Sequence, residues 1–158
     1  MGIGRRTGSW GVMADVWNKK KRSAVMSLIR SRGNHETELR LIEIFHTFRI
    51  RGWRRGQVLT GRPDFVFRAE RLVVFVDGCF WHGCHRCYRR PSSNQEYWDA
   101  KVARNRARDR AVTRKLRRKG WSVVRIWHHD LSIKRQSYTA GRILRARLRS
   151  EVVKAGLS

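Results

Sequence analysis

A cluster of cysteines that follows an apolar run constrains the fold more than any other feature of this sequence. The apolar run at 72–76 predicts a buried strand. All three cysteines of the chain come soon after it: Cys79, Cys84 and Cys87. Cys84 and Cys87 form a C-x-x-C pair, whose spacing is typical of zinc sites, and Cys79 adds a third thiolate from the strand end. The sequence therefore predicts a structural zinc ion beside a sheet.

Three thiolates leave one position of a tetrahedral zinc site to be filled from elsewhere in the chain. His129 directly follows a second apolar run at 121–127 and is the best candidate, although His85 could replace Cys84. Two other states compete with zinc binding. Reduced core cysteines need no C-x-x-C spacing, and a disulfide would leave one thiol over in a chain that no secretory signal precedes. We therefore expect a closed Cys₃His site.

The charge of the chain indicates a polyanionic partner. The 158 residues fit one domain, and they carry 37 Lys and Arg against 12 Asp and Glu, a formal net charge of +25. No apolar run approaches the length of a membrane-spanning helix and no lipidation motif is present, so nucleic acid is favoured over a membrane surface. Arginine outnumbers lysine, which suits bidentate phosphate and guanine contacts, although a GC-rich genome produces the same bias.

The N-terminal part of the chain divides at an internal methionine. Residues 1–12 are rich in Gly and Arg without periodicity and are expected to be a disordered extension. Residues 13–33 are expected to form a basic arm, with a helical turn or two, that lies along a DNA backbone; a solvated charge run is the alternative. We expect 13–158 to be a single domain. The arm carries a basic run, Lys19, Lys20, Lys21 and Arg22.

Helical and strand patterns alternate through the rest of the chain. Helices are expected from Asn34 to just before Gly52, over about 95–119 and over about 137–155. Strands are expected after Asp64, at 72–77 and at 121–127. This order predicts an α/β domain with a mixed central sheet flanked by helices. In the last helix the residues expected to face inward are Ile143, Leu144, Leu148 and Val152.

Carboxylates stand at the ends of two of these predicted strands. Asp64 follows a Gly/Pro turn and begins one strand, and Asp77 ends the next. Adjacent antiparallel strands would bring these ends together, with Asp64 near residues 76–77, where carboxylates could hold a hard cation such as magnesium. Asp is common at turns, so the Pro-Asp pair alone is a weak signal. Asp109 is the one acid among ten basic residues at 101–120, which by itself favours a salt bridge.

Several stretches together resemble one family. They are Gly61-Arg-Pro-Asp-Phe-Val, Val76-Asp-Gly-Cys-Phe-Trp-His, Tyr97-Trp98 followed by Asn105 and Asp109, and Gly120-Trp121 with Ile126-Trp127. They are similar to the very-short-patch repair (Vsr) mismatch endonucleases of bacteria, and the likeness runs from about Met13 to beyond His129. It implies a restriction-endonuclease-like fold of the PD-(D/E)xK type with a structural zinc. It also implies a magnesium-dependent nick 5′ to the T of a T:G mismatch that arises when 5-methylcytosine is deaminated.

The resemblance also implies roles for single residues. Asp64 becomes the metal-binding carboxylate, with the backbone carbonyl of Val76 as a second magnesium ligand. His82 becomes the catalytic histidine that activates water, and Asp109 becomes its orienting carboxylate. Glu38 matches an acidic residue near the active site.

A DNA-binding role for two adjacent aromatic residues follows from the same resemblance. Phe80 and Trp81 would otherwise be assigned to the core. The family inserts this pair beside the mismatched base step, and a methionine of the N-terminal arm, here Met26, enters from the other side. Such a wedge unstacks a base step, which a mismatch makes easier.

The chain departs from the family pattern at two places. Asp77 stands where the family often has a second catalytic histidine; an aspartate could bind magnesium, but it cannot protonate a leaving group at neutral pH unless its pKa is strongly raised. The zinc loop has Cys84 and Cys87 with His129 in place of the histidine-rich version of some relatives.

Together these features lead us to expect a monomer of the bacterial cytoplasm, associated with the nucleoid. Its partner is double-stranded DNA that contains a T:G mismatch, and no membrane is involved. Two other functions stay open, a sequence-specific restriction-type endonuclease of the same fold and a non-catalytic zinc DNA-binding module.

Overall fold

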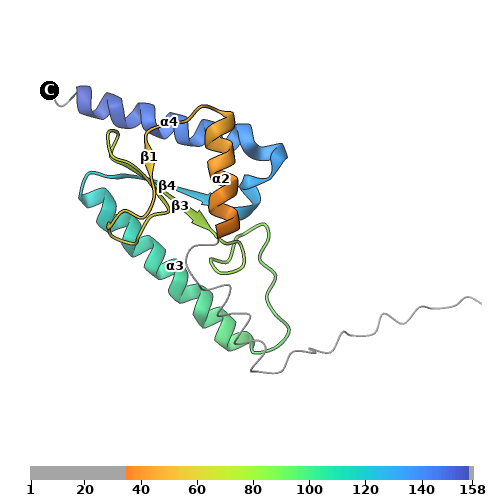
Figure 1. Cartoon of the computed structure of the whole chain (residues 1–158). Helices are drawn as coiled ribbons and strands as arrows, with labels where there is room; N and C mark the ends of the chain where they lie inside the picture. The colour runs from red at the N-terminus through yellow and green to blue at the C-terminus, as the bar shows by residue number, and fades with distance from the viewer. Residues whose placement is uncertain (1–34, 157–158) are drawn as a thin grey trace, which may run out of the picture. The chain divides into compact units, whose positions relative to one another are not determined.

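A four-stranded mixed sheet lies at the centre of the structure, a computed structural model that describes residues 35–156 (Figure 1). The strands are β1 (Trp53–Arg54), β2 (Phe65–Phe67), β3 (Leu72–Asp77) and β4 (Ser122–Trp127), in that order across the sheet. β2 runs antiparallel to both of its neighbours, β1 and β3, and β4 is parallel to β3. The prediction of an α/β domain with a mixed sheet is confirmed.

Within the described residues, three helices accompany this sheet: α2 (His35–Thr47), α3 (Gln95–Arg118) and α4 (Gln136–Ala155). Two short 3₁₀ turns, η1 (His128–Leu131) and η2 (Ile133–Arg135), connect β4 to α4. The predictions for the extension at 1–12, the arm at 13–33 with Met26 and its basic run, and the N-cap at Asn34 lie outside the described residues. Residues from His35 onward form one compact unit.

Successive residues of a strand point to opposite faces, and each face of the sheet is covered by different helices. One hydrophobic cluster joins α2 and α4 to alternate strand residues, including Phe65, Phe67, Leu72, Val74 and Ile126. The intervening residues Val66, Val73 and Phe75 pack with Leu116 of α3 in a second cluster. The sheet is therefore sandwiched between α2 and α4 on one face and α3 on the other (Figure 1).

The prediction for the inward face of α4 is wrong at three of its four positions. Ile143 is fully buried, but Leu144 is 39% exposed, Leu148 61% and Val152 71%. The buried positions of the helix are small or polar instead: Thr139, Ala140 and Ser150. Small side chains let the helix lie close to the sheet, and the leucine stripe falls on the adjacent, exposed face.

The topology brings the candidate catalytic residues together at one end of the strands, where β3 and β4 finish and β2 begins. Because β3 and β4 are parallel, Asp77 and Trp127 end their strands side by side. Because β2 is antiparallel to β3, the start of β2 lies at the same end, and Asp64 directly precedes it. The segment 78–94 and η1 both begin there.

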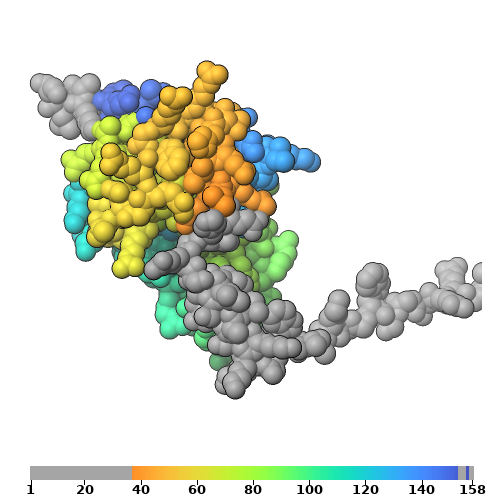
Figure 2. All heavy atoms as spheres, in the orientation of Figure 1, coloured from red at the N-terminus to blue at the C-terminus, as the bar shows by residue number. Residues whose placement is uncertain are grey.

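In Figure 2 the side chains of α2 and of the segment that follows it form one packed face. Within residues 35–156 the structure has no helix that is both long enough and apolar enough to cross a membrane.

Candidate active site and metal centre

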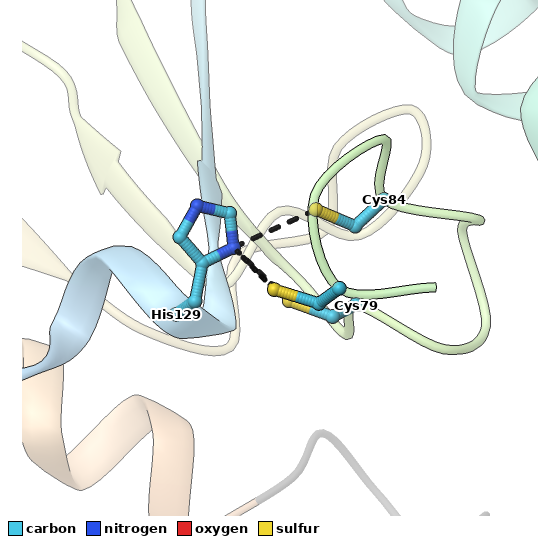
Figure 3. A group of neighbouring side chains, drawn as sticks. Cys79, Cys84 and His129 are labelled. Atoms are coloured by element: carbon cyan, nitrogen blue, oxygen red, sulfur yellow. Dashed lines mark hydrogen bonds between the residues drawn. The ribbon is translucent and has the colours of Figure 1, made fainter. Parts of the chain in front are cut away.

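The three cysteines and His129 converge on one point, as the sequence predicted. The His129 Nδ1 atom lies 3.3 Å from Cys79 Sγ, 3.5 Å from Cys84 Sγ and 3.3 Å from Cys87 Sγ. Figure 3 shows the sulfur atoms of Cys79 and Cys84 directed at this nitrogen. With bonds of about 2.0–2.3 Å, tetrahedral zinc separates its ligand atoms by distances of this size. The donor set is therefore suited to one zinc ion, and it includes Cys84 rather than the exposed His85.

A buried carboxylate orients the histidine of this Cys₃His cluster. His129 Nε2 lies 3.3 Å from the Oδ1 atom of Asp130, which is 3% exposed and is in turn held by Arg135 Nε at 2.7 Å. A carboxylate on the outer nitrogen of a ligating histidine fixes the tautomer with a free Nδ1, which is the atom that faces the thiols. Asp130 was missed from the sequence, because an acid after His-His has no signature of its own.

The thiols of the cluster do not ionise equally in the absence of a cation. Burial raises the pKa of Cys79 to about 12, although a backbone hydrogen bond from His129 opposes the shift. Burial also acts against ionisation of Cys84, but backbone hydrogen bonds from Arg86 and Cys87 hold its pKa below the usual value. A divalent cation would favour all three thiolates. Zinc binding is therefore expected to release protons.

Asp64 lies against the end of β3, where the sequence placed it. Its Oδ2 atom accepts a hydrogen bond of 2.7 Å from the backbone N–H of Val76. The N–H and C=O of one strand residue leave on the same side of the strand. The carbonyl of Val76 therefore lies on the Asp64 side of β3. A carboxylate beside a backbone carbonyl is an oxygen donor set of the kind that magnesium takes.

The local environment of Asp64 disfavours the ionised form of its carboxyl group. Burial raises its pKa to about 6, and the nearby charges of Glu38 and Asp77 act in the same direction. The hydrogen bond from Val76 opposes them. Glu38 therefore does lie close enough to act on Asp64, although its own carboxylate is paired with Arg55. A cation bound beside Asp64 would stabilise the ionised form of its carboxyl group.

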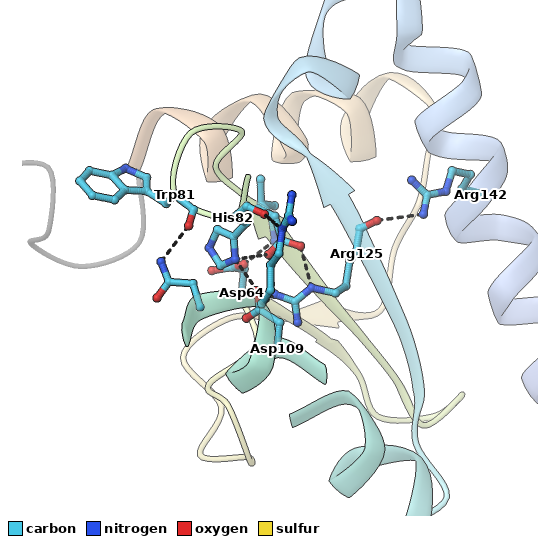
Figure 4. Close-up of polar contacts among 10 residues, drawn as sticks. Asp64, Trp81, His82, Asp109, Arg125 and Arg142 are labelled. Carbon is cyan, nitrogen blue, oxygen red and sulfur yellow. Dashed lines mark hydrogen bonds and ion pairs between the residues drawn. The ribbon is translucent and has the colours of Figure 1, made fainter. Parts of the chain in front are cut away.

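His82 and Asp109 form a hydrogen-bonded pair between the loop after β3 and helix α3. Asp109 Oδ2 contacts His82 Nδ1 (Figure 4). Burial disfavours the charge on Asp109, but the hydrogen bond to His82 and the charge of Arg125 hold the pKa of Asp109 below its usual range. An ionised carboxylate on Nδ1 leaves His82 Nε2 free to accept a proton. Composition alone favoured a salt bridge as the role of Asp109. That interpretation is incomplete, because Asp109 also forms the hydrogen bond with His82.

Arg125 of β4 binds the carboxylates of both Asp77 and Asp109. Its Nε lies 2.6 Å from Asp77 Oδ2 and its Nη2 2.5 Å from Asp77 Oδ1. The same Nη2 lies 3.0 Å from Asp109 Oδ1. The neighbouring charges of Asp77 and Asp109 raise the pKa of Arg125 against the effect of burial. Asp77 is 4% exposed and engaged on both oxygens, so it is placed as the partner of an arginine.

Helix α3 holds the loop that carries His82. Asn105 donates a 2.8 Å hydrogen bond to the carbonyl of Trp81, and Arg106 donates to the carbonyls of His82 and Gly83. Gly83 has a φ of +61°, and a Cβ there would lie 2.5 Å from Val102 of α3. Only glycine allows this close approach. Arg106 and Arg125 were missed from the sequence, where they do not stand out among the other arginines.

One cavity connects these groups. It has a volume of about 470 Å³, and Asp64, Val76, Asp77, His82 and Asp109 are among the residues that line it. Asp64 and Val76, which are suited to bind a cation, therefore line the same cavity as the His82–Asp109 pair. A phosphate group bound there would meet a cation site and a proton acceptor together.

Phe80 and Trp81 lie outside both hydrophobic clusters that form the core of residues 35–156. Each is only half-buried. Phe80 contacts the rings of Trp81 and Trp98, with centroid separations of 5.2 Å and 5.1 Å. Trp81 points away from the catalytic cluster in Figure 4. Their position is that of an aromatic group on the loop after β3, not of core residues.

Comparisons with known proteins show which family this sequence is similar to. Residues 14–89 match the family model described as DNA mismatch endonuclease Vsr. The type II nicking enzyme V.XorIIP of Xanthomonas oryzae pv. oryzae is 38% identical over 122 residues, which cover 76% of this chain and 88% of the enzyme. The DNA mismatch endonuclease Vsr of Escherichia coli K12 is 38% identical over 121 residues, which cover 73% of this chain and 74% of that one.

A further relative is similar over a shorter stretch. The type II nicking enzyme V.NaeI of Lentzea aerocolonigenes is 46% identical over 77 residues, so that 49% of this chain matches 46% of the enzyme. Family model, relatives and site geometry lead to one conclusion: this chain belongs to the Vsr family of DNA mismatch endonucleases.

Proposed function

We propose that this protein is a magnesium-dependent endonuclease that nicks one strand of DNA 5′ to the T of a T:G mismatch and so starts very-short-patch repair. The observation that carries the proposal is the shared cavity, in which Asp64 and Val76 lie with the His82–Asp109 pair. Membership of the Vsr family supports the mismatch substrate and implies the restriction-endonuclease-like fold. The net charge of +25 supports a DNA partner.

The residues present can carry out hydrolysis of a phosphodiester. His82 Nε2 accepts the proton of an attacking water, and the carboxylate of Asp109 on Nδ1 stabilises the imidazolium that forms. Asp64 and the carbonyl of Val76 would hold magnesium, which when bound polarises the scissile phosphate and stabilises its developing charge. Asp77 serves the reaction through Arg125, because both of its oxygens are engaged there. The proton for the leaving group then comes from solvent.

A nicking assay over a panel of duplexes tests this function. Each duplex differs only at one base pair, which is T:G, another mismatch or a matched pair. The proposal requires magnesium-dependent cleavage of the T-containing strand of the T:G duplex and little cleavage of the homoduplex. Double-strand cleavage of the homoduplex would instead identify a restriction-type enzyme. Binding without cleavage would identify a DNA-binding module.

We assign the Cys₃His cluster a structural zinc ion, because four protein ligands leave no open position. Replacing Cys87 with alanine is expected to lower the zinc content well below about one per chain and to lower the melting temperature, because structural zinc supplies folding energy directly. Metal analysis and thermal melting measure the two effects. His85→Ala is the matched control, since His85 is exposed and outside the cluster. An equally stable, zinc-free wild-type protein would contradict the assignment.

We propose that Phe80 and Trp81, with Met26 of the N-terminal arm, form the wedge that unstacks the mismatched step. Trp81→Ala is expected to reduce cleavage of the T:G duplex roughly 10- to 100-fold, since stacking of an aromatic side chain on a base contributes about 1–3 kcal/mol. Binding to matched DNA at low salt should change little, because phosphate contacts dominate it.

The half-buried position of Trp81, outside both core clusters, supports a role in DNA contact over one in the core. Tyr97→Ala provides the control, because Tyr97 belongs to the same aromatic group but contacts Trp98 and is 55% exposed. Thermal melting is measured for both variants. A large fall in the stability of Trp81→Ala, with a proportionate loss of all DNA binding, would return Trp81 to a structural role.

A further inference from the structure

A series of hollows runs from the catalytic residues along helix α3. A hollow of about 290 Å³ beside His82 shares Asp109, Arg110 and Arg125 with a second hollow of about 330 Å³. The second shares Arg117 with a third, of about 460 Å³, between the end of α3, strand β4 and helix α4. We call the second and third hollows together the β4-edge groove. It lies on the opposite side of the His82–Asp109 pair from Asp64, which lines a separate cavity.

Arginine side chains from two helices line the β4-edge groove. Those of α3 and those of α4 are each spaced by three or four residues, so each set occupies one face of its helix. They are Arg110, Arg114, Arg117, Arg142, Arg145 and Arg149. Among residues 35–156, the one acidic residue that lines the groove is Asp109, at its catalytic end.

Most of these groove arginines are not used to hold the fold. Arg145 and Arg149 are exposed, and neither has a carboxylate partner within residues 35–156. On the same helix Arg147 is paired with Glu70 and packs on the ring of Phe67 at 5.0 Å. Arg142 Nη1 lies 3.8 Å from Asp130 Oδ2, so the uncompensated charge that α4 adds to the groove is that of Arg145 and Arg149. Uncompensated charge of this kind favours an anionic occupant.

We infer that the β4-edge groove binds the phosphodiester backbone of a nucleic-acid strand as it leaves the catalytic residues on the side away from Asp64. Steps of three or four residues separate the guanidinium groups along a helix by about 4.5–6 Å, so each wall offers a regular row of charge. Guanidinium groups bind phosphate in a bidentate manner. The inference rests on the proposed nucleic-acid substrate, because the groove begins at the catalytic residues.

An acidic peptide added to the sheet is the competing occupant, because β4 pairs only with β3 among the described strands. Such a peptide needs the outward backbone groups of β4 as partners. The carbonyl of Arg125 already accepts a 2.8 Å hydrogen bond from Arg142 Nη2 (Figure 4). This contact places a side chain where the added strand would lie. The structure therefore favours the phosphodiester backbone.

Salt-dependent DNA binding by two charge-matched variants tests the inference. Arg145→Gln/Arg149→Gln removes two groove charges, and Arg51→Gln/Arg54→Gln removes two exposed charges near or within β1, at the opposite edge of the sheet. Fluorescence anisotropy without magnesium measures binding to T:G duplexes with a short or a long flank. The groove variant is expected to lower the slope of log K against log salt by roughly 2, about 0.9 for each lost phosphate contact. The control should retain the slope of the wild type.

The flank length and the binding stoichiometry separate two sources of the strand. An effect that appears only with the long flank at one duplex per chain assigns the groove to the flank of the bound duplex. A second duplex per chain, lost in the groove variant, assigns it to another nucleic-acid molecule. The first outcome supports the inference, and the second would overturn it, because a separate duplex is not the strand that leaves the catalytic residues.

Equal slopes for the two double variants would overturn the inference. So would a slope unchanged in the groove variant together with loss of binding to polyglutamate, which would identify a peptide site. Arg117→Gln gives a second variant on the other helix if the first fails to fold. Because binding is measured without cleavage, the result stands apart from the T:G nicking assay, which tests the proposed function separately.

Discussion

Replacement of Asp64 by asparagine is expected to slow nicking of a T:G duplex roughly a thousandfold or more. Loss of the carboxylate removes a cation ligand, and a bound cation contributes several kcal/mol of transition-state stabilisation. Binding to the same duplex should be nearly unchanged, since Asp64 makes no phosphate contact of its own. Single-turnover nicking and anisotropy measure the two effects. Cleavage at the wild-type rate would show that Asp64 is not the catalytic carboxylate.

The same substitution should stabilise the magnesium-free protein at neutral pH. The pKa of Asp64 is about 6 in the folded protein against 3.8 as the ordinary value, so the folded state binds the proton more tightly. Stability then falls as the pH rises from about 4 through 6, and the ionised carboxylate costs about 3 kcal/mol at most above that range. Asparagine carries no such charge, and its carbonyl can still accept from Val76 N–H.

Denaturant unfolding at two pH values tests this sign. Asp64→Asn should be more stable than the wild type at pH 8, and the difference should shrink as the pH falls through 6 toward 4. The buffer contains neither magnesium nor chelator, so that zinc is retained. Added magnesium should narrow the difference at pH 8, because it binds only the folded wild type. Glu43→Gln, at an exposed position of α2, is the control. A variant less stable at pH 8 would contradict the prediction.

Replacement of Arg125 by methionine is expected to lower the free energy of unfolding by about 3–5 kcal/mol. The substitution leaves the carboxylates of Asp77 and Asp109 without their arginine, and removal of one partner from a buried ion pair has an effect of this size. The side chains of Arg125 and Asp77 are 23% and 6% exposed, so solvent replaces little of the lost interaction. Denaturant unfolding measures the change.

A double-mutant cycle separates the ion pair from the packing of the arginine on Phe75, whose ring centroid lies 4.7 Å away. Asp77→Asn in the Arg125→Met background should restore part of the lost stability, because it removes the carboxylate that Arg125→Met leaves without its partner. Arg90→Met is the control, since its pair with Asp99 is about half exposed and is expected to contribute nothing measurable. If Arg125→Met unfolds like the wild type, the contacts of Arg125 with Asp77 and Asp109 do not stabilise the fold.

Features encoded by local spacing could be read from the sequence. The C-x-x-C pair and Cys79 predicted a metal cluster, and the structure brings them together with His129 within hydrogen-bonding distance of its Nδ1. Period-two strands on either side of a turn predicted that Asp64 would meet the end of β3, and its hydrogen bond to Val76 N–H confirms the meeting. In both cases the segments are short and the strand geometry is regular, so few other arrangements of these residues are possible.

Features that depend on packing between distant segments were decided only by the tertiary structure. Arg125 is one of many arginines, and it reaches Asp77 and Asp109 because the parallel register of β3 and β4 places all three on the α3 side of the sheet. The inward face of α4 was misread for a related reason. A stripe of leucines fits a helical period, but the sheet accepted the small residues beside it. Hydrophobic spacing defines the faces of a helix, and the surface it packs against decides which of them is buried.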